Sequence, residues 1–299
     1  MKNATPYKFH ETALATLFIL GNGVIIFPTA IADEYTFLAY LLCSAAAFLL
    51  FFSFGGLINR VYSFAPNGNT KPYKKVLITI LYFVSAAIAL YYLVKTFYDF
   101  SLFVSEVALR GFPIVVCFIV FLAMVVFFLL SQNEAFFKFS VIAFCFTAAV
   151  VIFFFLASLK NYRIGNIFIF SLPPIKTFIP QVNEYFKGLI LPVLLFLCFK
   201  AVVFKEVPQN YTFWGILSGV VLLGFCILNS VLLFGTRFSA TLDYPYASAV
   251  STVTIGRLFT RLDGFSYFVY FAAAVVRINV CTILIKSLFK KIQFLFKSN

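Results

Sequence analysis

Long runs of apolar residues, separated by short polar segments, occur along the whole chain. Eight of these runs have about 18 or more residues, the length that an α-helix needs to cross a lipid bilayer. The expected spans are residues 9–31, 35–58, 76–97, 113–131, 138–158, 178–203, 209–234 and 264–288. The pattern predicts an all-α polytopic membrane protein, with a single integral membrane domain over residues 1–299.

The polar segments between the spans differ in character. Residues 59–75 form a basic, turn-rich loop, and residues 161–177 form a longer connector with two adjacent prolines. The connector 235–263 is amphipathic, with its apolar side formed by Ala247, Val250, Leu258, Phe259 and Leu262. This last connector predicts an interfacial helix that caps the bundle.

Composition and charge agree with a membrane protein. The chain has 63% hydrophobic and 11% charged residues, outside the range of soluble domains. Its net charge of +13 is explained by Lys and Arg in cytoplasmic loops, so we expect a lipid bilayer and no nucleic acid as partner. The densest basic clusters, 71–75 and 286–297, both lie in the cytoplasm if the N-terminus does. Eight spans would then place both termini in the cytoplasm.

Residues that carry chemistry are sparse. The six cysteines lie inside apolar runs without CxxC spacing, and His10 is the single histidine, so we expect no disulfide, metal or cofactor. No G-x-S-x-G, HExxH or Walker motif occurs, so we expect no enzyme. No span has a central Asp, Glu or Lys, which weakens the case for proton-coupled pumping.

The first expected span contains GNGVIIFP at residues 21–28. Gly and Pro are poor helix formers, and in lipid a helix break survives only where protein or water covers it. One interpretation is a ligand site, in which unwound backbone at Gly21, Asn22 and Gly23 contacts a polar ligand. The other is close helix packing through small residues, with a tolerated kink at Pro28. The sequence leaves both open.

The last expected span places Arg277 almost at its centre. A central Arg costs about 2.5–3.5 kcal/mol on insertion scales, which the many apolar residues of this span offset. One helical stripe facing the interior combines Tyr267, Tyr270, Ala274, Arg277 and Cys281, spaced by three and four residues. A charge inside the membrane is typical of a functional site, here the binding of a ligand carboxylate. The alternative is that Arg277 snorkels or pairs with a backbone carbonyl.

The sixth expected span is also irregular, because Pro180, Gly188 and Pro192 interrupt it. Either the chain enters a wet vestibule before the true span begins, or the span is discontinuous at Gly188–Pro192. Interrupted segments at corresponding positions of two halves indicate a transporter-type site. The first and sixth spans are five apart, as a five-helix repeat requires.

Small residues mark two further spans. The third has a face of two tyrosines and two alanines, Tyr82, Ala86, Ala89 and Tyr92. Packing explains this face, and lining of a ligand site is the second interpretation. In the seventh span, Gly215 and Gly219 form a small-xxx-small pair, which predicts close packing against another helix.

These motifs make the chain similar to the GerAB-type spore germination subunits, a branch of the amino acid–polyamine–organocation permeases. GNGVIIFP resembles the family's Gly-x-Gly-x-x-x-x-Pro first helix. Tyr244-Pro245 and then IGRLFTRLDGF, at residues 255–265, resemble the family's late Ile-Gly pair and its acidic triplet before a membrane helix. The order and spacing of the motifs cover essentially the whole chain.

The resemblance implies a LeuT-like fold of two inverted five-helix repeats, in which helices 1 and 6 are discontinuous. Residues 1–158 would form the first repeat and residues 159–299 an incomplete second repeat of helices 6–8. The family normally continues through two more helices, so alternating access is in doubt, and a truncated gene product is one explanation.

The resemblance also implies an amino-acid-sized site between helices 1, 3, 6 and 8. Gly21, Asn22 and Gly23 match the unwound part of helix 1, and helix 6 maps around Gly188–Pro192. The stripe through Arg277 lies on helix 8. The expected ligand-binding residues are Gly21, Asn22, Gly23, Tyr82, Gly188, Pro192, Tyr270, Ala274 and Arg277.

Family members act with a second membrane subunit and a lipoprotein in the inner membrane of bacterial endospores, where they sense nutrients and trigger germination. The leading hypothesis is therefore a subunit of a germinant receptor that binds an amino acid or a similar small nutrient. Two alternatives stay open: an amino-acid permease that moves its substrate, and a degenerate subunit that only scaffolds its partners.

Overall fold

A computed structural model describes most of the chain. The described residues are 5–23, 35–62, 72–109, 111, 113–130, 133–166, 175–239, 241–253 and 263–297. In chain order their helices are α1 (Thr5–Gly23), α2 (Thr36–Tyr62), α3 (Pro72–Phe103), η2 (Val104–Ala108), α4 (Ile114–Leu130), α5 (Asn133–Ala157), η3 (Leu159–Asn161), η4 (Ile164–Asn166), α6 (Ile175–Tyr185), η5 (Phe186–Ile190), α7 (Leu191–Val203), α8 (Gln209–Phe234), α9 (Thr236–Ser239), α10 (Pro245–Ser251) and α11 (Asp263–Lys297). Here η2 and η5 are π-helical turns, and η3 and η4 are 3₁₀ turns.

Six helical stretches of the described residues are long and apolar enough to cross a membrane. They are Thr36–Tyr62, Tyr73–Ala108, Glu134–Asn161, Phe178–Val203, Gln209–Phe234 and Gly264–Phe294. Each coincides with one of the eight expected spans, which supports an all-α, multi-pass membrane protein. The fourth expected span is the shorter apolar helix α4, and the first is described only as far as Gly23. The rest of GNGVIIFP, including Pro28, lies outside the described residues.

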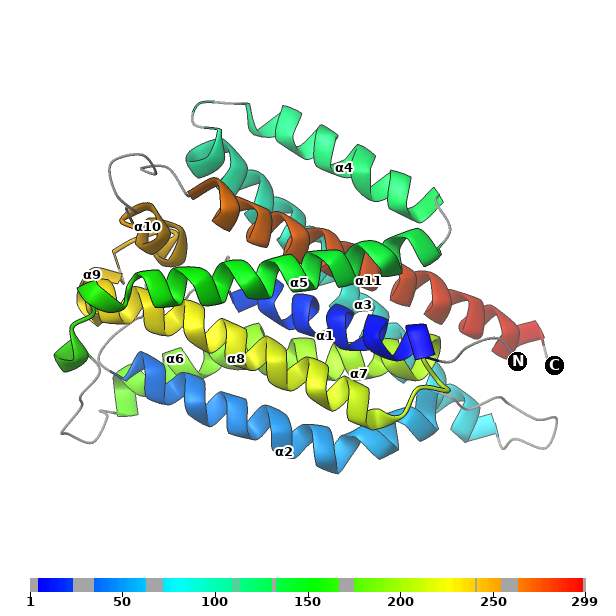
Figure 1. The fold of residues 1–299 in the computed structure, drawn as a ribbon. Coiled ribbons are helices and arrows are strands. Elements are labelled where there is room, and N and C mark those ends of the chain that lie inside the picture. Colours follow the sequence, from blue (N-terminus) through cyan, green and yellow to red (C-terminus); the bar gives the residue numbers. More distant parts are fainter. Residues whose placement is uncertain are drawn as a thin grey trace.

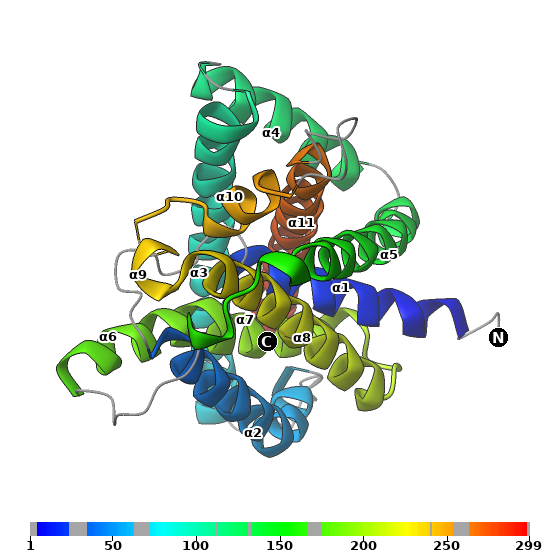
Figure 2. The ribbon, with the colours of Figure 1, turned by 60° about the vertical axis from the view of Figure 1, so that its left-hand side comes forward.

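The first helix forms the centre of the bundle. α1 packs against α5, α7, α8 and α11, whereas α2, α4 and α6 lie at the periphery (Figures 1 and 2). Residues 13–20 of α1 are completely buried on every face of the helix. A helix that is apolar all round and buried on all sides is typical of the core of a large helical bundle. The interior of this protein is therefore organised around α1.

The seam between α1 and α8 depends on small residues. A Cβ atom at Gly215 would lie 2.6 Å from the Cβ of Ala15 and 2.7 Å from the carbonyl oxygen of Thr12. A Cβ atom at Gly219 would lie 3.1 Å from the Cβ of Ile19. The Thr16 hydroxyl also donates to the carbonyl oxygen of Gly215 over 3.1 Å. The predicted role of the small-xxx-small pair in helix packing is confirmed.

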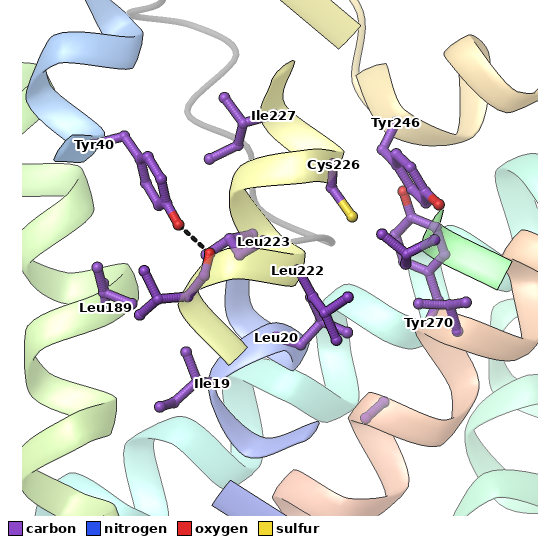
Figure 3. Close-up of a cluster of buried hydrophobic side chains, with 14 of the residues drawn as sticks. Ile19, Leu20, Tyr40, Leu189, Leu222, Leu223, Cys226, Ile227, Tyr246 and Tyr270 are labelled. Atoms are coloured by element: carbon purple, nitrogen blue, oxygen red, sulfur yellow. Dashed lines mark hydrogen bonds between the residues drawn. The ribbon is translucent and has the colours of Figure 1, made fainter. Parts of the chain in front are cut away.

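Apolar side chains continue this seam into a large core cluster (Figure 3). The labelled side chains from α1 and α8 are Ile19, Leu20, Leu222, Leu223, Cys226 and Ile227 (Figure 3). From α2, the Tyr40 hydroxyl donates a hydrogen bond to the carbonyl of Val220 (Figure 3). Tyr246 of α10 and Tyr270 of α11 lie beside each other next to Cys226. The core thus joins helices from both halves of the chain.

The sixth expected span is a continuous but irregular helix. α6, η5 and α7 follow one another without a gap, and the residues flanking η5, Tyr185 and Leu191, keep right-handed helical backbone angles. The expected discontinuity at Gly188–Pro192 is therefore wrong in form: the helix widens to a π turn and does not unwind. In this π turn the backbone N–H of Leu191 donates a hydrogen bond to the carbonyl of Phe186, five residues earlier. A π turn of this kind accommodates the irregularity that the sequence signals.

The connector 235–263 contains two short helices in its described part. Gly235 has a positive φ of 77°, and Pro245 begins α10, so the connector cannot form one uninterrupted helix. Ala247 and Val250 are buried, as α10 packs against α8 and α11. The other three residues of its expected apolar side, Leu258, Phe259 and Leu262, lie outside the described residues, as does most of IGRLFTRLDGF.

Candidate functional site

Arg277 is the most unusual side chain of the described structure. It lies near the middle of α11, it is completely buried at 0% exposure, and its Nε, Nη1 and Nη2 atoms have no hydrogen-bond partner among the described residues. A guanidinium group carries five N–H donors, and a buried charge without partners is strongly unfavourable. The arrangement fits a group that is completed by a bound anion. The interpretation in which Arg277 pairs with a backbone carbonyl finds no support in the described residues.

Two aromatic rings enclose the guanidinium group. Its Cζ atom lies 4.6 Å from the ring centroid of Tyr92 on α3 and 5.4 Å from that of Phe18 on α1. Such cation–π contacts contribute up to about 2 kcal/mol each when the groups are desolvated. The two rings are the contacts that the described residues provide to the guanidinium group, and they are not hydrogen-bond acceptors of the N/O type.

Tyr92 also connects Arg277 to the irregular sixth span. Its hydroxyl donates a hydrogen bond to the carbonyl of Lys187 in η5. Pro192 has no N–H and cannot donate to that carbonyl one π turn earlier in the helix. The Tyr92 hydroxyl supplies the missing donor. One tyrosine ring thus lies over Arg277 while its hydroxyl group binds the π turn that contains Gly188.

The glycine-rich end of α1 packs closely against α11. A Cβ atom at Gly21 would lie 3.0 Å from the carbonyl oxygen of Ala273, one turn of α11 away from Arg277. Gly21, Asn22 and Gly23 are the last three residues of α1 and are helical, so the expected unwinding does not occur at these positions. For Gly21 the structure therefore supports close helix packing. Whether the span breaks after Gly23 lies outside the described residues.

The rest of the α11 stripe is buried on the same side. Tyr270 stacks on Phe103 of α3, with ring centroids 4.2 Å apart and planes inclined by 18°. Ala274 and Cys281 are completely buried. Because α3 and α11 run antiparallel, Phe103 faces Tyr270 and Tyr92 faces Arg277. Tyr270 and Arg277 of the stripe contact α3, and Arg277 also contacts α1, but the residues of α11 between the stripe positions are buried as well, so α11 is surrounded on all sides at this level.

Tyr82 lies away from Arg277, although it shares a face of α3 with Tyr92. Ten residues of helix separate the two tyrosines, or about 15 Å along the axis. Tyr82 packs against Tyr62 of α2, with ring centroids 5.3 Å apart, and Lys291 lies 5.7 Å above its ring. The structure therefore places Ala274, and Ala273 against Gly21, within one turn of Arg277 and links the π turn of Gly188 to Arg277 through Tyr92. Tyr270, in contrast, lies two turns away against Phe103, and Tyr82 lies outside the region.

Sequence reasoning missed three participants of this region. Phe18 was hidden in an apolar run, and nothing in the sequence shows which of its faces meets Arg277. Tyr92 lies on the face that the sequence assigns to packing, with lining of a ligand site as the second interpretation, and it is not among the expected ligand-binding residues. Asp99 follows the expected third span, but α3 continues to Phe103, so this carboxylate is part of the helix. Its charge and that of Arg277 attract each other, although the two form no ion pair.

Comparison of the chain with protein-family models, with curated proteins and with solved structures gives no match. The function of this protein therefore has to be inferred from the residues of the chain itself.

Proposed function

We propose that this chain is a membrane subunit that binds an amino acid or a similar small nutrient, with Arg277 as the group that receives the ligand carboxylate. The observation that carries the proposal is the complete burial of a guanidinium group with no hydrogen-bond partner among the described residues. Arg recognises a carboxylate with two parallel N–H···O bonds, which a free amino acid can supply.

The surrounding contacts support a small ligand. The ring centroids of Phe18 and Tyr92 lie 5.4 Å and 4.6 Å from the guanidinium carbon, so apolar rings surround a group whose N–H donors have no partner among the described residues. Asp99 is an acidic group whose charge acts on the same region, and it offers a partner for a ligand ammonium group.

On this proposal the chain acts in the manner of the germinant-receptor subunits that its motifs resemble. It would work with a second membrane subunit and a lipoprotein in the inner membrane of a bacterial spore, with both termini in the cytoplasm. Ligand binding would change the packing around α1 and so signal to the partners.

A permease is the second candidate, and the π turn η5 favours it. π turns inside helices occur often at functional sites, and this one contacts Arg277 through Tyr92. A rearrangement of η5 would change the surroundings of a bound ligand, as transport requires.

Two measurements on the purified chain in lipid separate the candidates. Binding of radiolabelled amino acids to the chain in nanodiscs supports both the sensor and the permease, and its absence for every common amino acid favours a scaffold. Accumulation of the bound amino acid inside proteoliposomes would support the permease and contradict a pure sensor.

A further inference from the structure

A second buried charge lies at the other end of α1, on Glu11. This side chain is completely buried at 0% exposure, in the seam between α1, α7 and α8. The Thr212 hydroxyl of α8 donates a hydrogen bond to Oε1 of Glu11, while Oε2 has no partner among the described residues. A carboxylate buried in this way lacks most of the hydrogen bonds that it would need to stay charged.

A buried base lies near this acid. Lys200 of α7 is 2% exposed, and its charge acts on Glu11. The two side chains nevertheless form no ion pair, because Nζ of Lys200 donates to the carbonyl of Val207 over 3.0 Å. Neither charge is therefore neutralised by contact with the other. Oε2 of Glu11 has no donor among the described residues, so its burial favours the protonated acid, whereas Nζ of Lys200 keeps a hydrogen-bond acceptor.

The other charged groups around Glu11 are occupied elsewhere. On α1 itself, Lys8 lies 5.5 Å above the ring of Tyr211, and His10 packs against Phe137 of α5. Glu134 and Lys138 of α5 pair with each other over 2.8 Å. On α11, Lys286 and Lys290 are exposed, and Nζ of Lys291 donates a hydrogen bond to the carbonyl of Tyr62. Among the described residues, Lys200 is therefore the charged side chain whose electrostatic effect reaches Glu11.

We propose that Glu11 binds an exchangeable proton in the seam between α1, α7 and α8, and that the charge of Lys200 controls its release. In the proton-loaded state Oε2 carries the hydrogen, and the neutral acid needs no counter-ion. On release the proton passes to water, and the carboxylate that remains is stabilised by the Thr212 hydroxyl and by the ammonium group of Lys200. This site is separate from Arg277, because Phe18 lies seven residues, or about 10 Å, further along α1.

Infrared spectroscopy of the chain in nanodiscs tests this proposal directly, because a protonated carboxyl group has its own C=O stretching band. We expect this band at neutral pH, with a shift in D₂O that shows exchange, and its loss in Glu11→Gln. Glu184→Gln is the matched control, since Glu184 is already paired with Lys187 and should contribute no such band. In Lys200→Met the band should persist to higher pH, because the positive charge that favours the carboxylate is gone.

A band at neutral pH that survives unchanged in Glu11→Gln would overturn the proposal. If the variant does not fold, Glu11→Asp keeps a carboxyl group at this position, and ¹³C-labelled aspartate in that variant should then add a shifted band that the labelled wild-type chain lacks. The proposal requires that this label shift the band of the variant at neutral pH, and a band that does not shift belongs to another residue and contradicts it. These outcomes do not depend on whether Arg277 binds a nutrient.

Discussion

At the scale of single residues, Arg277 has an arrangement that folding alone does not explain. Its position in the chain predicted an interior charge, and the structure places it near two aromatic rings, with no hydrogen-bond partner for its N–H donors among the described residues. A buried ion without partners destabilises a fold, whereas an apolar side chain of similar length at the same place would not. The ligand carboxylate that we propose would supply the partner that the described residues lack.

Replacing Arg277 with Met should stabilise the ligand-free protein. We expect the free energy of unfolding to rise by on the order of 1 kcal/mol or more, because the cost of the unpaired charge exceeds the cation–π contacts that are lost. Thermal unfolding in detergent without added amino acid measures the change. Lys286→Met, an exposed change on the same helix, is the control and should leave the midpoint almost unchanged. A clear loss of stability in Arg277→Met would show that the charge has a structural partner.

Tyr92 gives a second prediction at this scale. Removing its hydroxyl in Tyr92→Phe takes away the donor to the part-buried carbonyl of Lys187, which should cost about 0.5–1.5 kcal/mol. The cost should be smaller in a Pro192→Ala background, because alanine at that position restores a backbone N–H that can serve the helix. Tyr91→Phe is the control, since Tyr91 is exposed beside Tyr92. Equal costs in both backgrounds would disprove the link between the proline and the tyrosine.

At the scale of helices, the sequence predicted the elements well and their contacts poorly. The expected span 209–234 coincides with α8, because membrane helices are defined by long apolar runs whose ends are polar. The form of the sixth span could not be predicted, since Gly188 and Pro192 show that a helix is disturbed but not whether it unwinds or takes one wider turn. The expected placement of Tyr82 beside Arg277 does not hold in the structure, for a related reason. A shared helix face does not mean a shared site when the residues are ten positions apart.

The α1–α8 seam provides the prediction that belongs to this scale. Gly215→Ala should destabilise the protein by about 1–3 kcal/mol, because the new methyl group meets the backbone and Cβ atoms of α1. The matched control is Gly56→Ala in α2, where a Cβ atom has nothing within 4 Å. That change should be neutral or slightly stabilising, because Ala favours the helix over Gly by up to about 1 kcal/mol. If both variants unfold at the same temperature, the seam is not tightly packed in solution.

At the scale of the whole molecule, α1 connects the two buried charges. Phe18 of α1 covers Arg277, and Glu11 of the same helix lies near Lys200 at the other end of the seam. The sequence showed neither neighbour, because Phe18 and Glu11 become important only when α7, α8 and α11 close around α1. The motifs predicted the interior charge of Arg277 and the irregular sixth span. The structure adds Tyr92, which contacts both.

Ligand selectivity tests the central claim most directly. The melting temperature of the purified chain should be measured with each common amino acid and with its amide, which lacks the carboxylate but keeps the side chain. We predict that at least one amino acid stabilises the wild-type chain, that its amide does not, and that Arg277→Met responds to neither. An amide that stabilises as well as its acid, or a full response in Arg277→Met, would contradict the account.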